Sequence, residues 1–205
     1  DVSDNDTAGI TLTESGGTTE VTEGGASDTY TLVLNSRPTE TVNVAFTFDP
    51  MQIILNGDTD GTYNTTFTTG NWDTSQTLTV TAVNDTLVED NPHTTTIVHA
   101  VTSADANYNA LSVSNMSVSI IDNDTITVVF ANPLPSLAEQ GTHNIPVRLD
   151  IVNNGLPGGT LSQSVTVSAT RINDTAEDAD SALTVAEVTF EAGATNGTTR
   201  NFVLS

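Results

Sequence analysis

The sequence contains no cysteine and no lysine. Without cysteine the chain cannot form disulfides, thiolate metal sites or a thiol nucleophile. Its histidines, His93, His99 and His143, are scattered and show no metal-ligand spacing. His99 lies beside Ile97 and Val101 in an alternating stretch, which is typical of a packed histidine in a strand rather than a catalytic one.

Aromatic residues and long apolar runs are also scarce. Aromatic side chains make up 5% of the chain, and Trp72 is the single tryptophan. No apolar run is long enough to cross a membrane, and residue 1 does not begin a signal peptide. Nucleophile elbows, phosphate loops and distinctive acid/base pairs are missing as well. We therefore predict a non-enzymatic protein without membrane insertion, and we interpret the chain as a piece of something longer.

The charge is strongly one-sided, with 26 acidic residues against four arginines and a net charge of −22. Such a surface repels nucleic acid and anionic membranes and attracts cations. The apolar fraction is only 36%. That fraction suits thin β-sandwiches with solvated outer faces better than a large enzyme core.

Alternating runs predict strands at residues 28–35, 41–48 and 76–83, with further strands near 94–102 and 111–121. Apolar residues at every second position indicate half-buried strands, and no stretch shows a helical period. The sequence therefore predicts an all-β fold of tandem Ig-like antiparallel sandwiches, each of about seven strands. The residues expected to face inward are Tyr30, Leu32, Leu34, Val42, Val44, Phe46, Phe48, Leu78, Val80 and Ala82.

An acidic motif marks the expected domain boundaries. Residues 121–124 (Ile-Asp-Asn-Asp) nearly repeat residues 2–6 (Val-Ser-Asp-Asn-Asp), and about one sandwich domain separates the two copies. We expect a linker at 1–7, a first sandwich at 8–124 and a second at 125–205. The second sandwich ends roughly two strands short, so we expect it to be truncated or completed by another chain.

Chain parity predicts a cation site in the first sandwich, because alternate strands end at the same pole. Several acidic segments at one pole repel each other unless a cation lies among them. Oxygen donors of this kind favour Ca²⁺, which takes six to eight oxygens, whereas Mg²⁺ fits less well. The alternative is a merely solvated acidic surface with ordinary turn chemistry. The candidate ligands are Glu23, Asp85, Glu89, Asp90, Asp122 and Asp124, and in the second sandwich Glu139, Asp174, Asp178 and Asp180.

Three segments, 19–35, 71–85 and 121–124, resemble the Calx-beta domain family, particularly the tandem repeats of large bacterial surface proteins. The resemblance implies a seven-stranded Ig-like sandwich that often binds Ca²⁺ at the pole next to the following domain. By position it implies the same six ligands in the first domain. The family's Ala-x-x-Gly-x-Asp-Tyr segment is absent from the first domain, and in the second domain Asp180 or Ser181 falls there.

These observations lead to three functional hypotheses. The first is an extracellular, cell-surface repeat module with a structural and adhesive role, whose partners are neighbouring repeats and whose junctions Ca²⁺ stiffens. The second is a filament subunit in which copies complete each other's sheets by strand exchange. The third is an accessory glycan-binding module of a secreted enzyme, although the sequence offers no aromatic platform for a sugar.

Overall fold

The computed structural model describes residues 6–132, 143–153, 155–169 and 186–204. The chain separates into two compact units. The first unit comprises Asp1–Asp85 and Asn91–Asp122, and the second comprises Thr86–Asp90 and Asn123–Ser205. The main chain therefore passes from one unit to the other three times. Residues 86–90 belong to the second unit although they lie within the first unit's stretch of sequence.

One sheet of the first unit contains four strands in the order β1-β3-β7-β5. Neighbouring strands in this sheet all run antiparallel. A 3₁₀ turn, η1, follows the first strand and leads into the other sheet. The strands are β1 (Ile10–Glu14), β3 (Asp28–Leu34), β5 (Ile53–Leu55) and β7 (Gln76–Ala82), and η1 spans Ser15–Gly17.

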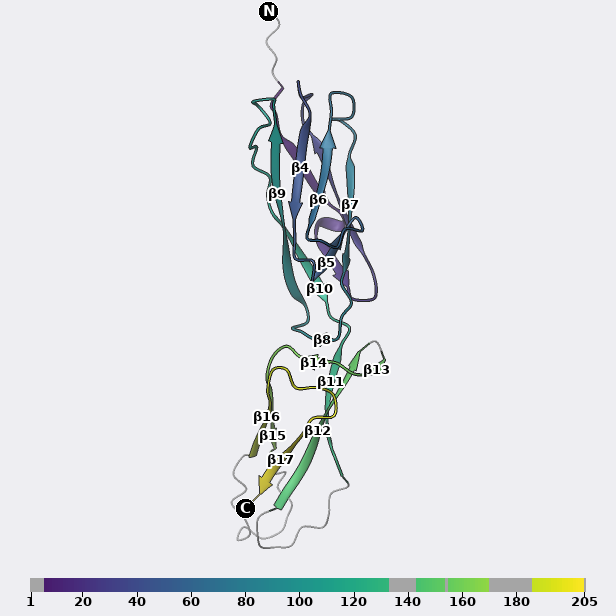
Figure 1. Ribbon diagram of the computed structural model, residues 1–205, viewed down its shortest axis with the longest axis vertical. Coiled ribbons are helices and arrows are strands. Elements are labelled where there is room, and N and C mark those ends of the chain that lie inside the picture. The colour runs from purple at the N-terminus through teal and green to yellow at the C-terminus, as the bar shows by residue number, and fades with distance from the viewer. Residues whose placement is uncertain (1–5, 133–142, 154, 170–185, 205) are drawn as a thin grey trace, which may run out of the picture. The chain divides into compact units, whose positions relative to one another are not determined.

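The other sheet of the first unit contains five strands in the order β2-β10-β9-β4-β6. Figure 1 shows β4 lying between β6 and β9, with which it pairs antiparallel. In contrast, β2 and β10 run parallel, so the strands that come first and last in this sheet along the chain are neighbours. The bounds are β2 (Thr19–Thr22), β4 (Val42–Thr47), β6 (Thr62–Phe67), β9 (His93–Ser103) and β10 (Met116–Ile121).

The core of the first unit lies between these two sheets. All ten residues expected to face inward are buried, which confirms the predicted period-two alternation. His99 is also buried; its Nδ1 lies 2.8 Å from the Ser114 carbonyl oxygen, and its Nε2 lies 3.3 Å from the Tyr30 hydroxyl. Because a carbonyl can only accept, Nδ1 carries the proton and Nε2 accepts from Tyr30. Burial lowers the pKa of His99, as expected for a packed neutral histidine.

A polar loop after β9 closes one pole of the first unit, the pole opposite to the ends of β2 and β10. Asp105 exposes 6% of its surface and accepts hydrogen bonds from the Thr39 amide (2.8 Å), the Thr39 hydroxyl (2.9 Å) and the Asn107 amide (2.9 Å). The buried Tyr108 hydroxyl donates to the Ser36 carbonyl at 2.6 Å. The bond from the Thr39 amide is the chief reason that the pKa of Asp105 lies below its ordinary value. This loop is thereby tied to the segment between β3 and β4.

Asp105→Asn should lower the melting temperature of the first unit at pH 7. A carboxylate with a lowered pKa contributes stability above 3.8, its ordinary pKa, and loses that contribution as the pH falls through the folded-state value. The melting temperatures of wild type and variant should therefore converge at about pH 2. Thermal melts followed by Trp72 fluorescence test this, since Trp72 packs against the core of the first unit. An equal difference at both pH values would contradict it.

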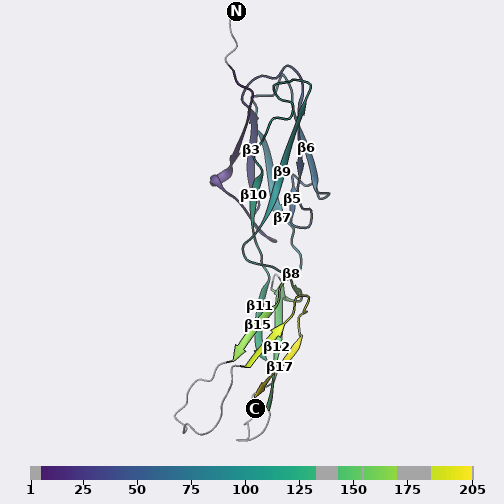
Figure 2. The ribbon, with the colours of Figure 1, turned by 90° about the vertical axis from the view of Figure 1, so that its left-hand side faces the viewer.

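The second unit is built around a sheet in which β12 pairs with β11, β13 and β17, all antiparallel. Figure 2 shows β11, β12 and β17 lying side by side. A separate pair, β15 and β16, packs over the same core, and β14 pairs with β8. The strands are β8 (Leu87–Val88), β11 (Thr125–Phe130), β12 (His143–Asn153), β13 (Leu156–Pro157), β14 (Thr160–Leu161), β15 (Val165–Ala169), β16 (Ala186–Phe190) and β17 (Thr199–Leu204).

The predicted fold class is confirmed, because the described residues form β-sheets around two separate cores and contain no α-helix. One local expectation was wrong. The pairing is not purely antiparallel, since β2–β10 and β8–β14 are parallel. The acidic segment 84–92, which lies outside the predicted strands, contains β8. Residues 49–75, which show no clear alternation, also contain the strands β5 and β6.

Candidate functional site: the carboxylates at the ends of β2 and β10

Glu23 and Asp122 are neighbouring buried carboxylates in the first unit. Glu23 follows β2 and Asp122 follows β10, and the last register pair of these parallel strands is Thr22 with Ile121. The Glu23 amide donates to the Ile121 carbonyl at 3.0 Å, so the strand-like approach continues to these residues. Glu23 exposes 3% of its surface and Asp122 exposes 4%. Two acidic residues at adjacent main-chain positions are therefore both withdrawn from water.

The position of Asp122 is held further by the segment that follows β8. The Asn91 side-chain amide donates to the Asp122 carbonyl oxygen at 2.8 Å. This hydrogen bond is accepted by the main chain of Asp122. The backbone around the pair is thus fixed from β2 on one side and from Asn91 on the other.

Asp85 lies at the same pole of the first unit as Glu23. Strand β7, which Asp85 follows, is antiparallel to β3, and β3 starts after the tight turn that begins at the end of β2. Strands β2, β7 and β10 therefore end at one pole. Asp85 is half-buried. Chain parity thus places the three predicted ligands of the first unit, Glu23, Asp85 and Asp122, at a common end.

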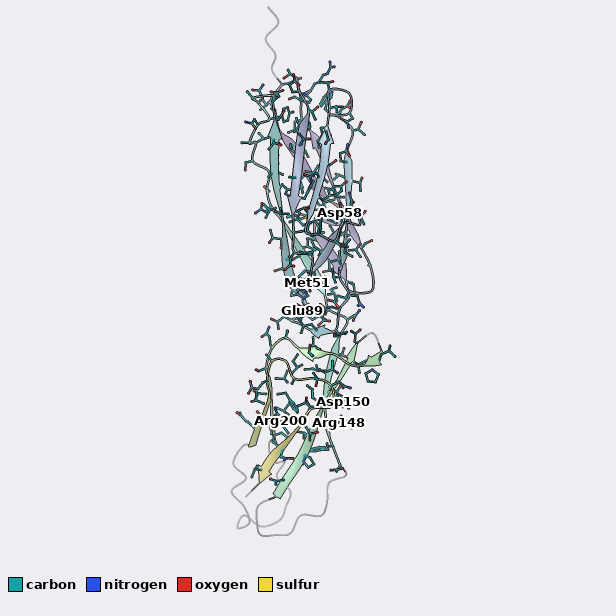
Figure 3. All side chains as sticks on the ribbon, viewed as in Figure 1. Met51, Asp58, Glu89, Arg148, Asp150 and Arg200 are labelled. Atoms are coloured by element: carbon teal, nitrogen blue, oxygen red, sulfur yellow. The ribbon has the colours of Figure 1, made fainter. Side chains whose placement is uncertain are left out.

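The other three predicted ligands of the first sandwich belong to the second unit. Glu89 and Asp90 follow β8, and Asp124 precedes β11 (Figure 3 labels Glu89). Asp124 exposes 5% of its surface, whereas Glu89 is half-buried and Asp90 is exposed. The Gln163 side-chain amide donates to Asp90 Oδ2 at 2.7 Å. Glu89 and Asp90 also line a hollow of ≈ 210 Å³ in the second unit, together with Ile126, Leu161 and Val165.

A Ca²⁺ ion takes six to eight oxygen ligands. Glu23 and Asp122 fit as two adjacent carboxylate donors of the chemistry that Ca²⁺ prefers. Among the residues that the structure describes, no group of three or more histidine, aspartate or glutamate side chains is arranged to hold a metal ion. The candidates Glu139, Asp174, Asp178 and Asp180 lie outside the described residues. The calcium site stays a prediction that rests on the pair.

Arginine meets an acid on the outer face of β12. Arg148 Nε donates to Asp150 Oδ1 at 2.6 Å, and its Nη2 donates to Oδ2 at 2.9 Å (Figure 3). Hydrogen bonding to Arg148 lowers the pKa of Asp150. Both side chains are well exposed, so this pair adds little stability. The pair neutralises one acid of the second unit.

The interactions that sequence reasoning missed are the ones made by the backbone of residues 86–90. We expected the acids of this segment to bind a cation, and we did not predict a strand at Leu87 and Val88. The only pattern that pointed to one was the apolar pair Leu87–Val88 inside an otherwise polar segment. That pair indicates a buried contact somewhere, but it does not say with which strand.

No helix among the described residues is long and apolar enough to cross a membrane. No family model matches the sequence, and no curated protein matches it either. Similar solved structures include the calcium binding domain CBD12 of CALX1.1, at 15% identity over 95% of this chain and 74% of that one, with a TM-score of 0.39. CBD12 from CALX1.2 is 16% identical over 94% and 73% of the chains, with a TM-score of 0.40.

The periplasmic chaperone SfaE is also similar, at 10% identity over 93% of this chain and 97% of that one, with a TM-score of 0.39. Chains with different stated roles thus show the same degree of likeness. At these identities and TM-scores the likeness carries no argument about ligands or partners. The chain is an all-β protein of two sandwich-like units.

Proposed function

We propose that the chain is a non-enzymatic repeat module of an extracellular or cell-surface protein, with a structural and adhesive role. In this proposal Ca²⁺ binds at the pole of the first unit where β2, β7 and β10 end. Its partners are neighbouring repeats of the same protein. The net charge of −22 supports a role that involves cations, and the all-β architecture supports a spacer built from repeated sandwiches.

The observation that carries the calcium proposal is the burial of Glu23 beside Asp122. Burial strengthens the repulsion between like charges, because the local dielectric constant is lower than that of water. A divalent cation converts this repulsion into attraction and uses the oxygens that both carboxylates offer. Asp122 is the first residue of the connection at 122–125, so a cation bound to it would also restrain that connection.

Thermal unfolding with millimolar Ca²⁺, with EDTA and with Mg²⁺ tests the proposal. Ca²⁺ should raise the melting temperature of the first unit, by an amount that corresponds to about 2.7 kcal/mol at a concentration 100 times the dissociation constant. Mg²⁺ should have a much smaller effect. Limited proteolysis at residues 122–125 should be slower in Ca²⁺ than in EDTA. Equal melting temperatures in Ca²⁺ and EDTA would mean that the acids form only a solvated surface.

A second candidate function, a filament subunit assembled by strand complementation, is favoured by the edge of β15. In the first unit β4 pairs with β6 on one side and with β9 on the other. In the second unit β15 and β16 form the corresponding pair, and the described residues place no strand on the other edge of β15. An exposed strand edge is a template for a strand from another copy.

Analytical ultracentrifugation over a range of concentrations tests this alternative. Strand complementation predicts end-to-end association that grows with concentration and is insensitive to EDTA. A single monomeric species at all concentrations would exclude it and would leave the spacer module as the better account.

A further inference from the structure

The segment Thr86–Asp90 behaves as a docked strand in the second unit. Its strand β8 pairs in parallel with β14, with Leu87 opposite Thr160 and Val88 opposite Leu161. The Thr160 amide donates to the Thr86 carbonyl at 2.9 Å, and the Ser162 amide donates to the Val88 carbonyl at 3.0 Å. Main-chain bonds of this kind hold a peptide whatever its side chains are, as in β-strand addition.

Side chains add selectivity to this docking. Val88 packs against the core of the second unit, next to the buried Leu161. The Ser162 hydroxyl donates to the Val88 carbonyl at 2.5 Å, and Gln163 holds the carboxylate of Asp90. Strand β14, Ser162 and Gln163 therefore accept a short extended peptide in which an apolar residue is followed, two positions later, by an acid.

Gly159 is shaped for the approach of this peptide. Its φ is +114°, a conformation that favours glycine. A Cβ built at Gly159 would lie 2.7 Å from the Thr86 carbonyl oxygen and 2.9 Å from Ile151 Cγ2. The neighbouring Gly158 has a φ of +156°, and nothing lies within 4 Å of a Cβ built there. The close approach of Thr86 is thus a specific property of position 159.

From these contacts we propose that β14, together with Gly159, Ser162 and Gln163, is a docking site for an extended peptide, and that its occupant is residues 86–90 of the preceding repeat. The second unit thereby includes a strand that lies within the first unit's stretch of sequence. The proposal goes beyond the spacer function and is independent of calcium. It makes the folding of residues 86–90 depend on the second unit and not on the first.

Hydrogen exchange measured by mass spectrometry on the full chain tests whether the folding of residues 86–90 depends on the second unit. In wild type, peptides covering 86–92 and 158–164 should both be protected. Phe190→Ala, which removes a buried side chain from the second core, should release the 86–92 peptide while β7 and β9 stay protected. If the 86–92 peptide stays protected when the second unit is unfolded, the first unit holds it and the proposal is wrong.

The paired variants Gly159→Ala and Gly158→Ala test whether the docking site holds residues 86–90. Gly159→Ala should speed exchange in both peptides by about tenfold or more, because the added methyl group displaces the Thr86 carbonyl. Gly158→Ala also places alanine at a positive φ but adds no clash, so it should speed exchange of the 86–92 peptide much less than Gly159→Ala. Faster exchange confined to 158–164 in Gly159→Ala would mean that the clash with Ile151 alone matters, which would also overturn the proposal.

Discussion

Phe190→Ala is expected to destabilise the second unit strongly and to leave the stability of the first unit unchanged. Phe190 is fully buried in a core that contains no residue of the first unit's core. Truncation of a buried phenylalanine costs about 3–5 kcal/mol, and a small domain has only about 5–15 kcal/mol of stability. The melting temperature of the second unit should fall by about 15 °C or more, because 1 kcal/mol shifts a domain of this size by about 4–8 °C.

The aromatic residues make the two units separately observable. Trp72 and the three tyrosines, Tyr30, Tyr63 and Tyr108, all belong to the first unit. Fluorescence therefore follows the first unit, whereas far-ultraviolet circular dichroism follows both. The control is Phe130→Ala on β11, because Phe130 is 58% exposed and its loss should change stability by only about 0.5 kcal/mol. A fluorescence transition that shifts as much as the dichroism would show that the units do not unfold separately.

Glu23→Gln is expected to change stability in opposite directions with and without calcium. In EDTA the variant should melt at a higher temperature than wild type, because the substitution removes the repulsion between Glu23 and the adjacent Asp122. In Ca²⁺ it should melt at a lower temperature than wild type, because a charged ligand has been lost. An affinity loss of about tenfold corresponds to about 1.4 kcal/mol.

Thermal melts monitored by Trp72 fluorescence, in EDTA and at increasing Ca²⁺ concentrations, measure the change in melting temperature under both conditions. Glu20→Gln is the matched control, since Glu20 lies on the same strand β2, carries the same charge and is exposed. It should leave the calcium-dependent shift unchanged. The role of Glu23 as a ligand would be excluded if its variant and wild type gained the same stability from Ca²⁺. A lower melting temperature of Glu23→Gln in EDTA would exclude the repulsion.

Local sequence patterns were sufficient to predict the strands whose alternate side chains are buried in the core between the two sheets. The alternation of Tyr30, Leu32 and Leu34 predicts a half-buried strand because side chains point to opposite faces at each step. Strand β6 was missed because only Phe67 at its end is buried, and its polar residues carry no alternation signal. Strand β8 was missed because its partner β14 lies far along the chain, and two residues cannot indicate such a pairing.

The candidate site shows the same division between local and distant information. Chain parity is sufficient to place Glu23 and Asp122 at one pole, because strand direction alternates along an antiparallel sandwich. Parity does not indicate that β2 and β10 are direct neighbours, which depends on the parallel pairing of strands from opposite ends of the unit. Nor does it indicate that Glu89 and Asp90 leave with β8 for the second unit.

The parallel pairing of β2 with β10 has a consequence for a chain that is pulled. Tension from the N-terminal side acts first on β1, which pairs with β3. Once β1 has separated from β3, tension reaches the start of β2 and leaves the unit after the end of β10, so these two strands are drawn past each other lengthwise. The register from Thr19 with Val118 to Thr22 with Ile121 then resists as a block, since its bonds share the load instead of opening one after another. Glu23 and Asp122 lie at the end of this block, and a cation bound there would reinforce it against rupture.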